Sequence, residues 1–169
     1  VITPGDVKIY TSYGKMIKKD FYIAEIDVSD TEKGTYPHYM LKEIYEQSEV
    51  VFSTLAKRIK GGLPDFTEDG LENDYFKDIS QIHIIGCGSA MHVGLIGKGL
   101  IEKYARIPTS VFVASEYRYS PPLKSDNTLC IFISQSGETA DTLASLDYAK
   151  KNGYKALSIV NSQGSSIAI

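Results

Sequence analysis

Short apolar runs alternate with polar turns throughout the second half of the chain. Four runs rich in β-branched or aromatic residues predict buried strands, at residues 82–85, 110–114, 129–133 and 156–160. Apolar residues at helical spacing follow the first and third runs, from Ala90 to Tyr104 and from Ala140 to Ala149. Strand–helix–strand units of this spacing are joined by right-handed crossovers. We therefore predict an α/β fold with three layers, in which a parallel sheet has helices on both faces.

The first 34 residues show a different pattern. Short alternating segments predict two strands, Val7–Tyr10 and Phe21–Ile26, joined by a turn at Ser12–Lys15. An isolated hairpin is only marginally stable, so we expect this hairpin-like segment to pack on another part of the protein, inside or outside this chain. The polar stretch Ser29–Gly34 is the predicted linker.

A long helix is predicted between this linker and the first buried strand. Pro37 suits a first helical turn, and Gly61-Gly62 is expected to end the helix. Its apolar residues form one broad stripe, made of Met40, Leu41, Ile44, Tyr45, Val51, Phe52, Leu55, Ala56 and Ile59. Core packing is expected for most of this stripe, and a dimer face is the alternative. The acidic stretch 63–80 is expected to be a surface loop or a short helix.

Composition narrows the classes of function. The chain has 169 residues, of which 43% are hydrophobic and 23% are charged, values typical of a globular domain with a real core. A net charge of −3 leaves no basic stripe to neutralise phosphates, which argues against nucleic-acid binding. No signal peptide is apparent, and no apolar run approaches the roughly 18 residues that a membrane helix needs. We expect a cytoplasmic protein without membrane contact.

Cysteine and histidine positions predict neither a disulfide nor a metal site. Cys87 and Cys130 lie in or beside apolar runs without C-x-x-C spacing, which fits a reducing compartment. His38, His83 and His92 are scattered and have no carboxylate or cysteine at ligand spacing. Structural or surface roles are expected for all three histidines, and no metal or cofactor is predicted.

The polar loop after the third strand is the strongest candidate for a functional site. It consists of Ser134-Gln135-Ser136-Gly137-Glu138-Thr139 and leads directly into a helix. Unpaired backbone N–H groups and the positive end of the helix dipole lie where a helix begins, so this loop predicts an anion pocket. A simple N-cap at Ser136 or Thr139 is the alternative. One cap, however, explains only one of the four polar side chains at positions 134, 135, 136 and 139.

A second polar turn, Gly86-Cys87-Gly88-Ser89, follows the first strand. Ligands of parallel sheets bind beyond the carboxyl ends of the strands, where the winding reverses, so both loops are expected to share one ligand. The turn is a weak match to a dinucleotide fingerprint because Met91 stands where the third glycine is required. A Walker A lysine is also missing, which argues against a triphosphate. Hydroxyls and backbone amides favour a single phosphate monoester carried by a sugar.

Residues 134–142, Ser-Gln-Ser-Gly-Glu-Thr-Ala-Asp-Thr, resemble the signature of the sugar isomerase (SIS) domain family, whose fold is flavodoxin-like. In this extended form the segment is similar to the glutamine:fructose-6-phosphate aminotransferases, also called glucosamine-6-phosphate synthases. Three further segments agree with that family: residues 38–47, residues 114–119, and Asn161 with Gly164-Ser165-Ser166. The resemblance extends roughly from Gly34 to the end of the chain.

This resemblance implies a two-part enzyme. An N-terminal glutaminase releases ammonia from glutamine, and two SIS subdomains aminate and isomerise fructose 6-phosphate to glucosamine 6-phosphate. Residues 1–34 would be the tail of the glutaminase domain and a linker, and residues 35–169 would be the first SIS subdomain, truncated at its C-terminal end. The implied partners are the two phosphosugars, the glutaminase domain, the second SIS subdomain, and a second copy in a homodimer.

The resemblance also assigns site residues. Substrate binding is implied for Ser134, Gln135, Ser136, Thr139, Gly88 and Ser89. Ala90 replaces a serine that is usual in the family, so one sugar contact is expected to be missing. The family's isomerisation residues lie in the second subdomain, so no catalytic residue is expected here and this piece would bind phosphosugar without catalysis. The alternative is a non-catalytic, phosphosugar-sensing SIS module of a regulator.

Overall fold

The computed structural model describes residues 1–19 and 32–168 of the chain. Two compact units make up the chain, Val1–Glu68 and Asp69–Ile169. The second unit holds the parallel sheet and both polar loops.

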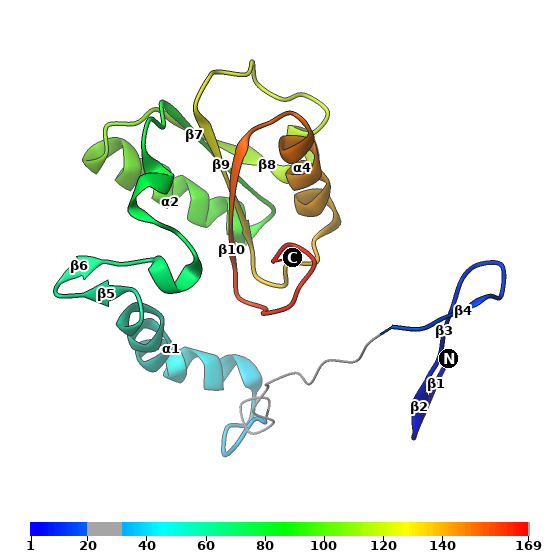
Figure 1. Cartoon of the computed structure of the whole chain (residues 1–169). Helices are drawn as coiled ribbons and strands as arrows, with labels where there is room; N and C mark the ends of the chain where they lie inside the picture. The colour runs from blue at the N-terminus through cyan, green and yellow to red at the C-terminus, as the bar shows by residue number, and fades with distance from the viewer. Residues whose placement is uncertain (20–31, 169) are drawn as a thin grey trace. The chain divides into compact units, whose positions relative to one another are not determined.

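Four parallel strands form the sheet of the second unit. They are β7 (Gln81–Gly86), β8 (Thr109–Val113), β9 (Thr128–Ser134) and β10 (Lys155–Val160). The spatial order is β10-β9-β7-β8, and every neighbouring pair is parallel. All four strands that the apolar runs predict are therefore confirmed, within one or two residues at each end (Figure 1).

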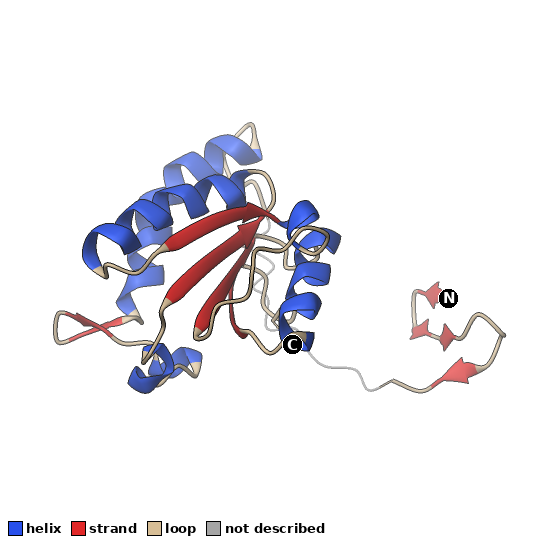
Figure 2. Ribbon diagram, turned by 90° about the horizontal axis from the view of Figure 1, so that it is seen from above, coloured by secondary structure: helices blue, strands red, loops and turns tan. Residues whose placement is uncertain are grey.

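Helices cover both faces of this sheet (Figure 2). Helix α2 (Ser89–Tyr104) packs on the face that carries Ile82, Ile84, Leu129 and Ile131. The one-turn helix α3 (Ala114–Tyr117) and helix α4 (Ala140–Lys151) pack on the other face, which carries Ile85, Cys130 and Phe132. The side chains of successive strand residues point to opposite faces of the sheet, so a single strand contributes side chains to the hydrophobic cores on both faces. The three-layer α/β prediction is confirmed.

Close packing of α2 on the sheet depends on one glycine. A methyl group added at Gly94 would lie 2.8 Å from Cγ2 of Ile84 and 3.2 Å from Cγ1 of Val111. The other two glycines of the helix differ, since a methyl group at Gly97 would make an ordinary contact and one at Gly99 would meet nothing within 4 Å. The helix backbone therefore approaches the sheet closely at Gly94 and not at Gly99.

A buried polar chain crosses the core on the α4 side. His83 Nδ1 lies 2.9 Å from the Tyr117 hydroxyl, which in turn lies 3.4 Å from Cys130 Sγ. Burial lowers the pKa of His83 and raises the pKa of the Cys130 thiol to about 11. Both His83 and Cys130 are fully buried, so the structural role expected of this histidine is confirmed. Cys87 and Cys130 both carry free thiols.

The first unit begins with short antiparallel strand pairs. Strands β1 (Ile2–Thr3) and β2 (Asp6–Val7) form one pair, and β3 (Ile9–Tyr10) and β4 (Met16–Ile17) form another. The predicted turn at residues 12–15 is confirmed, but the strand that follows it is β4, and the predicted strand at residues 7–10 is divided between β2 and β3. The predicted strand at residues 21–26 lies outside the described residues, as does the first half of the predicted linker.

Helix α1 (Tyr39–Ala56) ends earlier than predicted. Ile59–Lys60 is a strand, β5, which pairs with β6 (Leu63–Pro64). Gly61 and Gly62 form the turn of this small hairpin, with φ values of 61° and 80°. Two consecutive positive φ angles are the requirement of a type I′ hairpin turn, and glycine adopts them without strain. The glycine pair therefore reverses a strand and does not end a helix.

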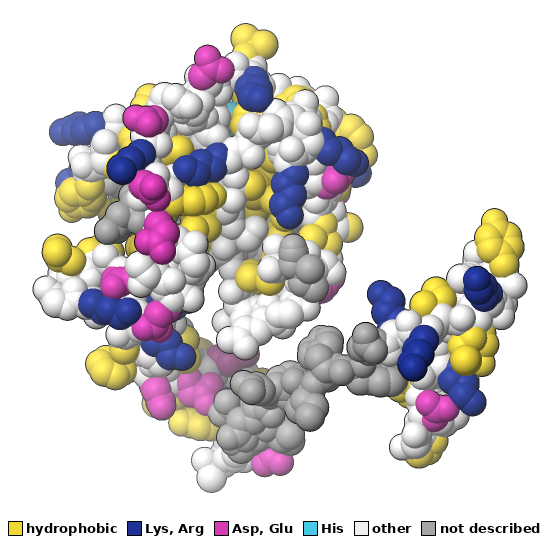
Figure 3. Space-filling model, viewed as in Figure 1, with side chains coloured by type: hydrophobic (Ala, Val, Ile, Leu, Met, Phe, Trp, Pro, Cys, Tyr) yellow, Lys and Arg dark blue, Asp and Glu magenta, His cyan; other side chains and the backbone are white. Residues whose placement is uncertain are grey.

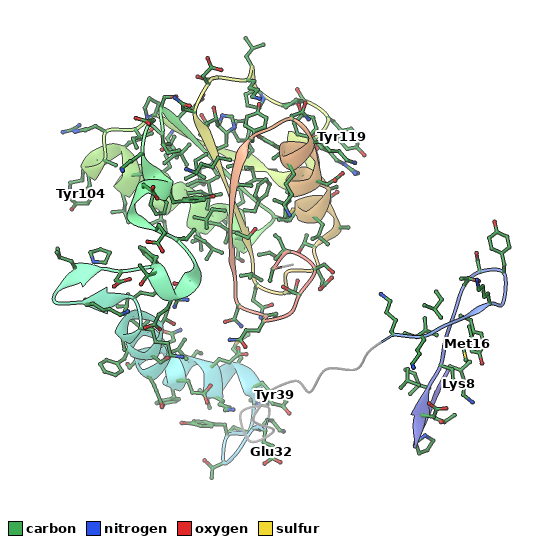
Figure 4. The ribbon with its side chains drawn as sticks, in the orientation of Figure 1. Lys8, Met16, Glu32, Tyr39, Tyr104 and Tyr119 are labelled. Atoms are coloured by element: carbon green, nitrogen blue, oxygen red, sulfur yellow. The ribbon has the colours of Figure 1, made fainter. Side chains whose placement is uncertain are left out.

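The apolar stripe of α1 is not covered within its own unit. The helix buries none of its residues, and Phe52 is 74% exposed. Tyr39, at the start of the helix, is 55% exposed (Figure 4). The core packing predicted for this stripe is therefore not found among the described residues of Val1–Glu68, because the short strand pairs of this unit do not cover it. The dimer face, which was the alternative, stays a prediction.

The acidic stretch 63–80 contains two short 3-10 helices, η2 (Thr67–Asp69) and η3 (Asn73–Phe76), as expected for a surface segment. Acidic and basic side chains are interspersed over the face turned to the viewer in Figure 3. Among the described residues, no helix combines the length and the apolar character needed to cross a membrane.

Candidate functional site

The winding of the sheet reverses between β7 and β9. From β7 the chain moves to β8 on one side, then crosses back to β9 on the other side and continues outward to β10. The carboxyl ends of these central strands are level, since Gly86 is paired with Ile133. The turn at residues 86–89 and the loop at residues 134–139 leave these ends, so both lie at the crevice that such sheets use for ligands. This shared location was expected from the sequence.

The first turn joins β7 to α2 with little space to spare. A methyl group added at Gly86 would lie 3.1 Å from the backbone N of Met91 and 3.2 Å from Cβ of Ala90. Gly88 is the N-cap residue of α2, with φ at 55°, and Ser89 is its first residue. Both Gly88 and Ser89 are exposed, and no side chain among the described residues caps this helix. The amide donors of its first turn are thus not occupied by a capping side chain.

Hydrogen bonds within the second loop fix two of its hydroxyl groups. The buried Ser134 Oγ accepts the Gly137 N–H at 3.0 Å. The exposed Ser136 Oγ accepts the Glu138 N–H at 3.2 Å. Each hydroxyl keeps its own proton, which leaves it able to donate to a phosphate or sugar oxygen. Gln135 is exposed, and its side chain makes no hydrogen bond within residues 32–168.

Helix α4 starts with Thr139 as its N-cap residue, in extended backbone with φ at −65° and ψ at 114°. No described side chain makes a capping hydrogen bond there, so the Thr139 hydroxyl is not used as a cap. The Ser136 hydroxyl bonds within the loop and does not cap the helix either. The simple N-cap interpretation of these residues is therefore not what the structure shows, and the positive end of the α4 dipole faces the loop.

The two carboxylates near the start of α4 have protein partners. Asp141, in the first helical turn, lies 3.9 Å from the guanidinium of Arg118. Glu138 accepts hydrogen bonds from the backbone N–H and the hydroxyl of Ser166, both at 2.7 Å, and they lower the pKa of its carboxyl. The Glu138 carboxylate is thus engaged by a specific contact with the segment after β10.

The segment after β10 packs against the second loop, a contact that sequence reasoning missed. The N–H of Ile167 donates to the Gly137 carbonyl at 3.1 Å, and the N–H of Ser162 donates to the Gln135 carbonyl at 3.3 Å. The described residues of this segment, up to 168, contain turns and no helix. The small polar residues 164–166 were the available signal, because only small side chains allow such close backbone contact.

Gly137 is the tightest point of this contact. Its φ is 69°, and a methyl group added to it would lie 2.1 Å from Ser165 Oγ and 2.9 Å from Cγ2 of Ile167. Ser165 is buried, and its hydroxyl has no hydrogen-bond partner among the described residues. Only glycine fits both the backbone angle and the space.

Comparisons with known proteins agree with this arrangement. The SIS domain family matches residues 75–169, the segment that contains the sheet and both loops. The glutamine–fructose-6-phosphate aminotransferase (isomerizing) of Clostridium acetobutylicum is 45% identical over 169 residues, and that of Clostridium tetani is 46% identical over 170 residues. These alignments include 99% of this chain but 28% of each relative, so the chain spans little more than a quarter of their length.

A solved structure shows the same fold. The C-terminal domain of glucosamine-fructose-6-phosphate aminotransferase from Francisella tularensis has a TM-score of 0.73 and 42% sequence identity. The alignment covers 80% of this chain and 38% of that chain.

Proposed function

The chain belongs to the SIS domain family, and on that premise we propose that it is the phosphosugar-binding part of an enzyme that aminates and isomerises fructose 6-phosphate. The observation that carries the proposal is the meeting of two polar loops at the reversal point of the sheet. Relatives named as aminotransferases of this kind are 45% and 46% identical across nearly the whole chain. The SIS-type fold provides the site, and the loops provide its chemistry.

The phosphate is bound by dipoles and hydroxyls without an obligatory cation. Helices α2 and α4 both begin at the crevice, from opposite faces of the sheet, so two positive helix ends flank the same space. Ser134, Ser136 and Thr139 add hydroxyl donors. Gln135 and Ser89 are exposed and have the chemistry to bind sugar hydroxyls, with Gly88 giving the backbone close access. Glu138 accepts two hydrogen bonds from Ser166, which lower the pKa of its carboxyl, so it is not suited to donate a proton at neutral pH.

The rest of the enzyme lies in other parts of the full protein. We propose residues 1–34 as the tail of a glutaminase domain with its linker, and residues 35–169 as the first, truncated SIS subdomain. Glutamine-derived ammonia and the isomerisation residues then come from the glutaminase domain and the second SIS subdomain. The exposed apolar stripe of α1 supports a homodimer or a contact with one of these domains. A cytoplasmic location fits free thiols at both cysteines.

Calorimetric titration of two serine variants tests the site. Ser136→Ala removes a hydroxyl from the loop, whereas Ser125→Ala removes an exposed hydroxyl that precedes β9, at the opposite edge of the sheet. We expect Ser136→Ala to weaken fructose 6-phosphate binding by about tenfold, the cost of one hydrogen bond to a charged group. Ser125→Ala should bind like the unaltered chain. Equal affinity in all three proteins would overturn the assignment of Ser136.

A further inference from the structure

The loop that we propose as the phosphate site contains one carboxylate, that of Glu138. An ionised carboxylate close to a phosphate dianion opposes binding by like-charge repulsion. The affinity for phosphate therefore depends on whether the Glu138 carboxylate points toward the phosphate or away from it.

The sheet order shows on which side the carboxylate lies. Both of its oxygens accept hydrogen bonds from Ser166, at 2.7 Å each. Ser166 follows β10, which borders β9 on one side, whereas β7 and its turn border β9 on the other. The crevice lies between β9 and β7. The contact with Ser166 therefore directs the carboxylate toward the segment that follows β10 and not toward the turn that follows β7.

The same segment restrains the loop at two more points. The Gly137 carbonyl accepts the Ile167 N–H at 3.1 Å, and the Gln135 carbonyl accepts the Ser162 N–H at 3.3 Å. These are neutral backbone contacts, and the pair between Glu138 and Ser166 is the charge-assisted one. It is also the contact that restrains residue 138 itself, which lies directly before the N-cap residue of α4.

We infer that Glu138 is a positioning residue of the phosphosugar site. Its two-oxygen contact with Ser166 fixes the 134–139 loop in its ligand-binding shape and keeps the charge of Glu138 away from the phosphate. This inference rests on the proposed function. A loop that is already ordered binds more tightly, because no free energy is spent on ordering it at the moment of binding.

The test measures fructose 6-phosphate affinity in the 169-residue chain and in three variants. Glu138→Ala should bind about tenfold more weakly, because the loop must be ordered on binding. Glu138→Gln should regain most of the affinity, since its carbonyl can accept the Ser166 N–H and its NH₂ group can donate to the Ser166 hydroxyl. The matched control is Asp147→Ala, which removes an exposed carboxylate from α4 and should leave affinity unchanged.

The direction in which Glu138→Ala changes the affinity for fructose 6-phosphate distinguishes charge repulsion from loop positioning. Tighter binding by Glu138→Ala would mean that the carboxylate only repels phosphate, and unchanged binding would mean that the contact with Ser166 does not matter. A Glu138→Gln variant as weak as Glu138→Ala would also overturn the inference.

A measurement without ligand separates the inference from the proposed function. Hydrogen exchange at the amides of residues 136–139 should be at least several-fold faster in Glu138→Ala than in Asp147→Ala. If the unaltered chain binds no phosphosugar but this difference is found, the proposed function fails and the positioning of the loop stands. If exchange is unchanged, the positioning role fails. If Glu138→Ala does not fold, Ser166→Ala, which removes one of the two hydrogen bonds, should still give a smaller effect in the same direction.

Discussion

Substitution of Gly137 by alanine gives a sharp test of the contact between the loop and the segment after β10. The added methyl group would lie 2.1 Å from Ser165 Oγ and 2.5 Å from Ser165 Cβ, distances that require the segment to move. The matched control is Gly153→Ala. Gly153 has the same φ of 69°, but its added methyl group would meet only the flexible end of Lys124, at 3.6 Å.

The two substitutions share the cost of an alanine in left-handed backbone, about 1–2 kcal/mol. Gly137→Ala adds the cost of overpacking, typically about 1–3 kcal/mol. We therefore expect the free energy of unfolding to fall by about 1–2 kcal/mol in Gly153→Ala and by about 2–5 kcal/mol in Gly137→Ala. Urea unfolding followed by circular dichroism measures both values. Equal losses in the two variants would refute the close contact between the loop and the segment after β10.

Three further predictions concern the core. Gly94→Ala should lower the free energy of unfolding by up to about 2 kcal/mol, because overpacking against a core isoleucine 2.8 Å away, which costs about 1–3 kcal/mol, outweighs the gain in helix propensity of about 1 kcal/mol. The unobstructed Gly99→Ala should raise the free energy of unfolding by up to about 1 kcal/mol. Urea unfolding measures both. Burial lowers the pKa of His83, so below about pH 6.5 the imidazole is protonated in the unfolded chain but not in the folded one, and the free energy of unfolding should drop from pH 7 to pH 5.5. His83→Gln should reduce that drop. An unchanged drop in this variant would assign the pH dependence to other groups. The buried Cys130 thiol, with its pKa raised to about 11, should react with iodoacetamide far more slowly than the half-buried Cys87 at pH 8, and equal rates by mass spectrometry would contradict its burial.

The sheet and its two loops could be predicted from the sequence because their signals are local. The four strands are compact apolar runs, and both polar loops directly follow two of them. Parallel connection then requires the loops at the carboxyl ends of β7 and β9 to share one edge of the sheet. The polar residues at positions 134–139 could therefore be brought next to the turn at residues 86–89 without coordinates.

Contacts between distant residues could not be predicted in this way. Glu138 and Ser166 are 28 residues apart, and no periodic pattern pairs a carboxylate with a serine at that distance. Helix α1 presents the opposite difficulty. Its stripe has the spacing of a core helix, but the helix buries none of its residues here. An apolar face predicts that something covers it without identifying the partner.

Local signals were also ambiguous at Gly61-Gly62. Two glycines after a helical pattern are typical of a helix end, yet they also suit a tight hairpin turn. In the structure β5 pairs with β6, with Ile59 opposite Pro64 and Lys60 opposite Leu63. This register shows that the two glycines form a hairpin turn and not a helix end. Two-residue strands are too short to show a periodicity of their own in the sequence.

The central claim is that a phosphosugar binds between the turn at residues 86–89 and the loop at residues 134–139. Its most direct test is a nitrogen-15 NMR titration of the chain with fructose 6-phosphate, with unphosphorylated fructose and ATP as controls. We expect amide shifts to change at Gly88, Ser89, Ser136 and Thr139, and the changes should be specific to the phosphosugar. Changes confined to the opposite edge of the sheet, around residues 124–128, or no change in a folded chain, would contradict the claim.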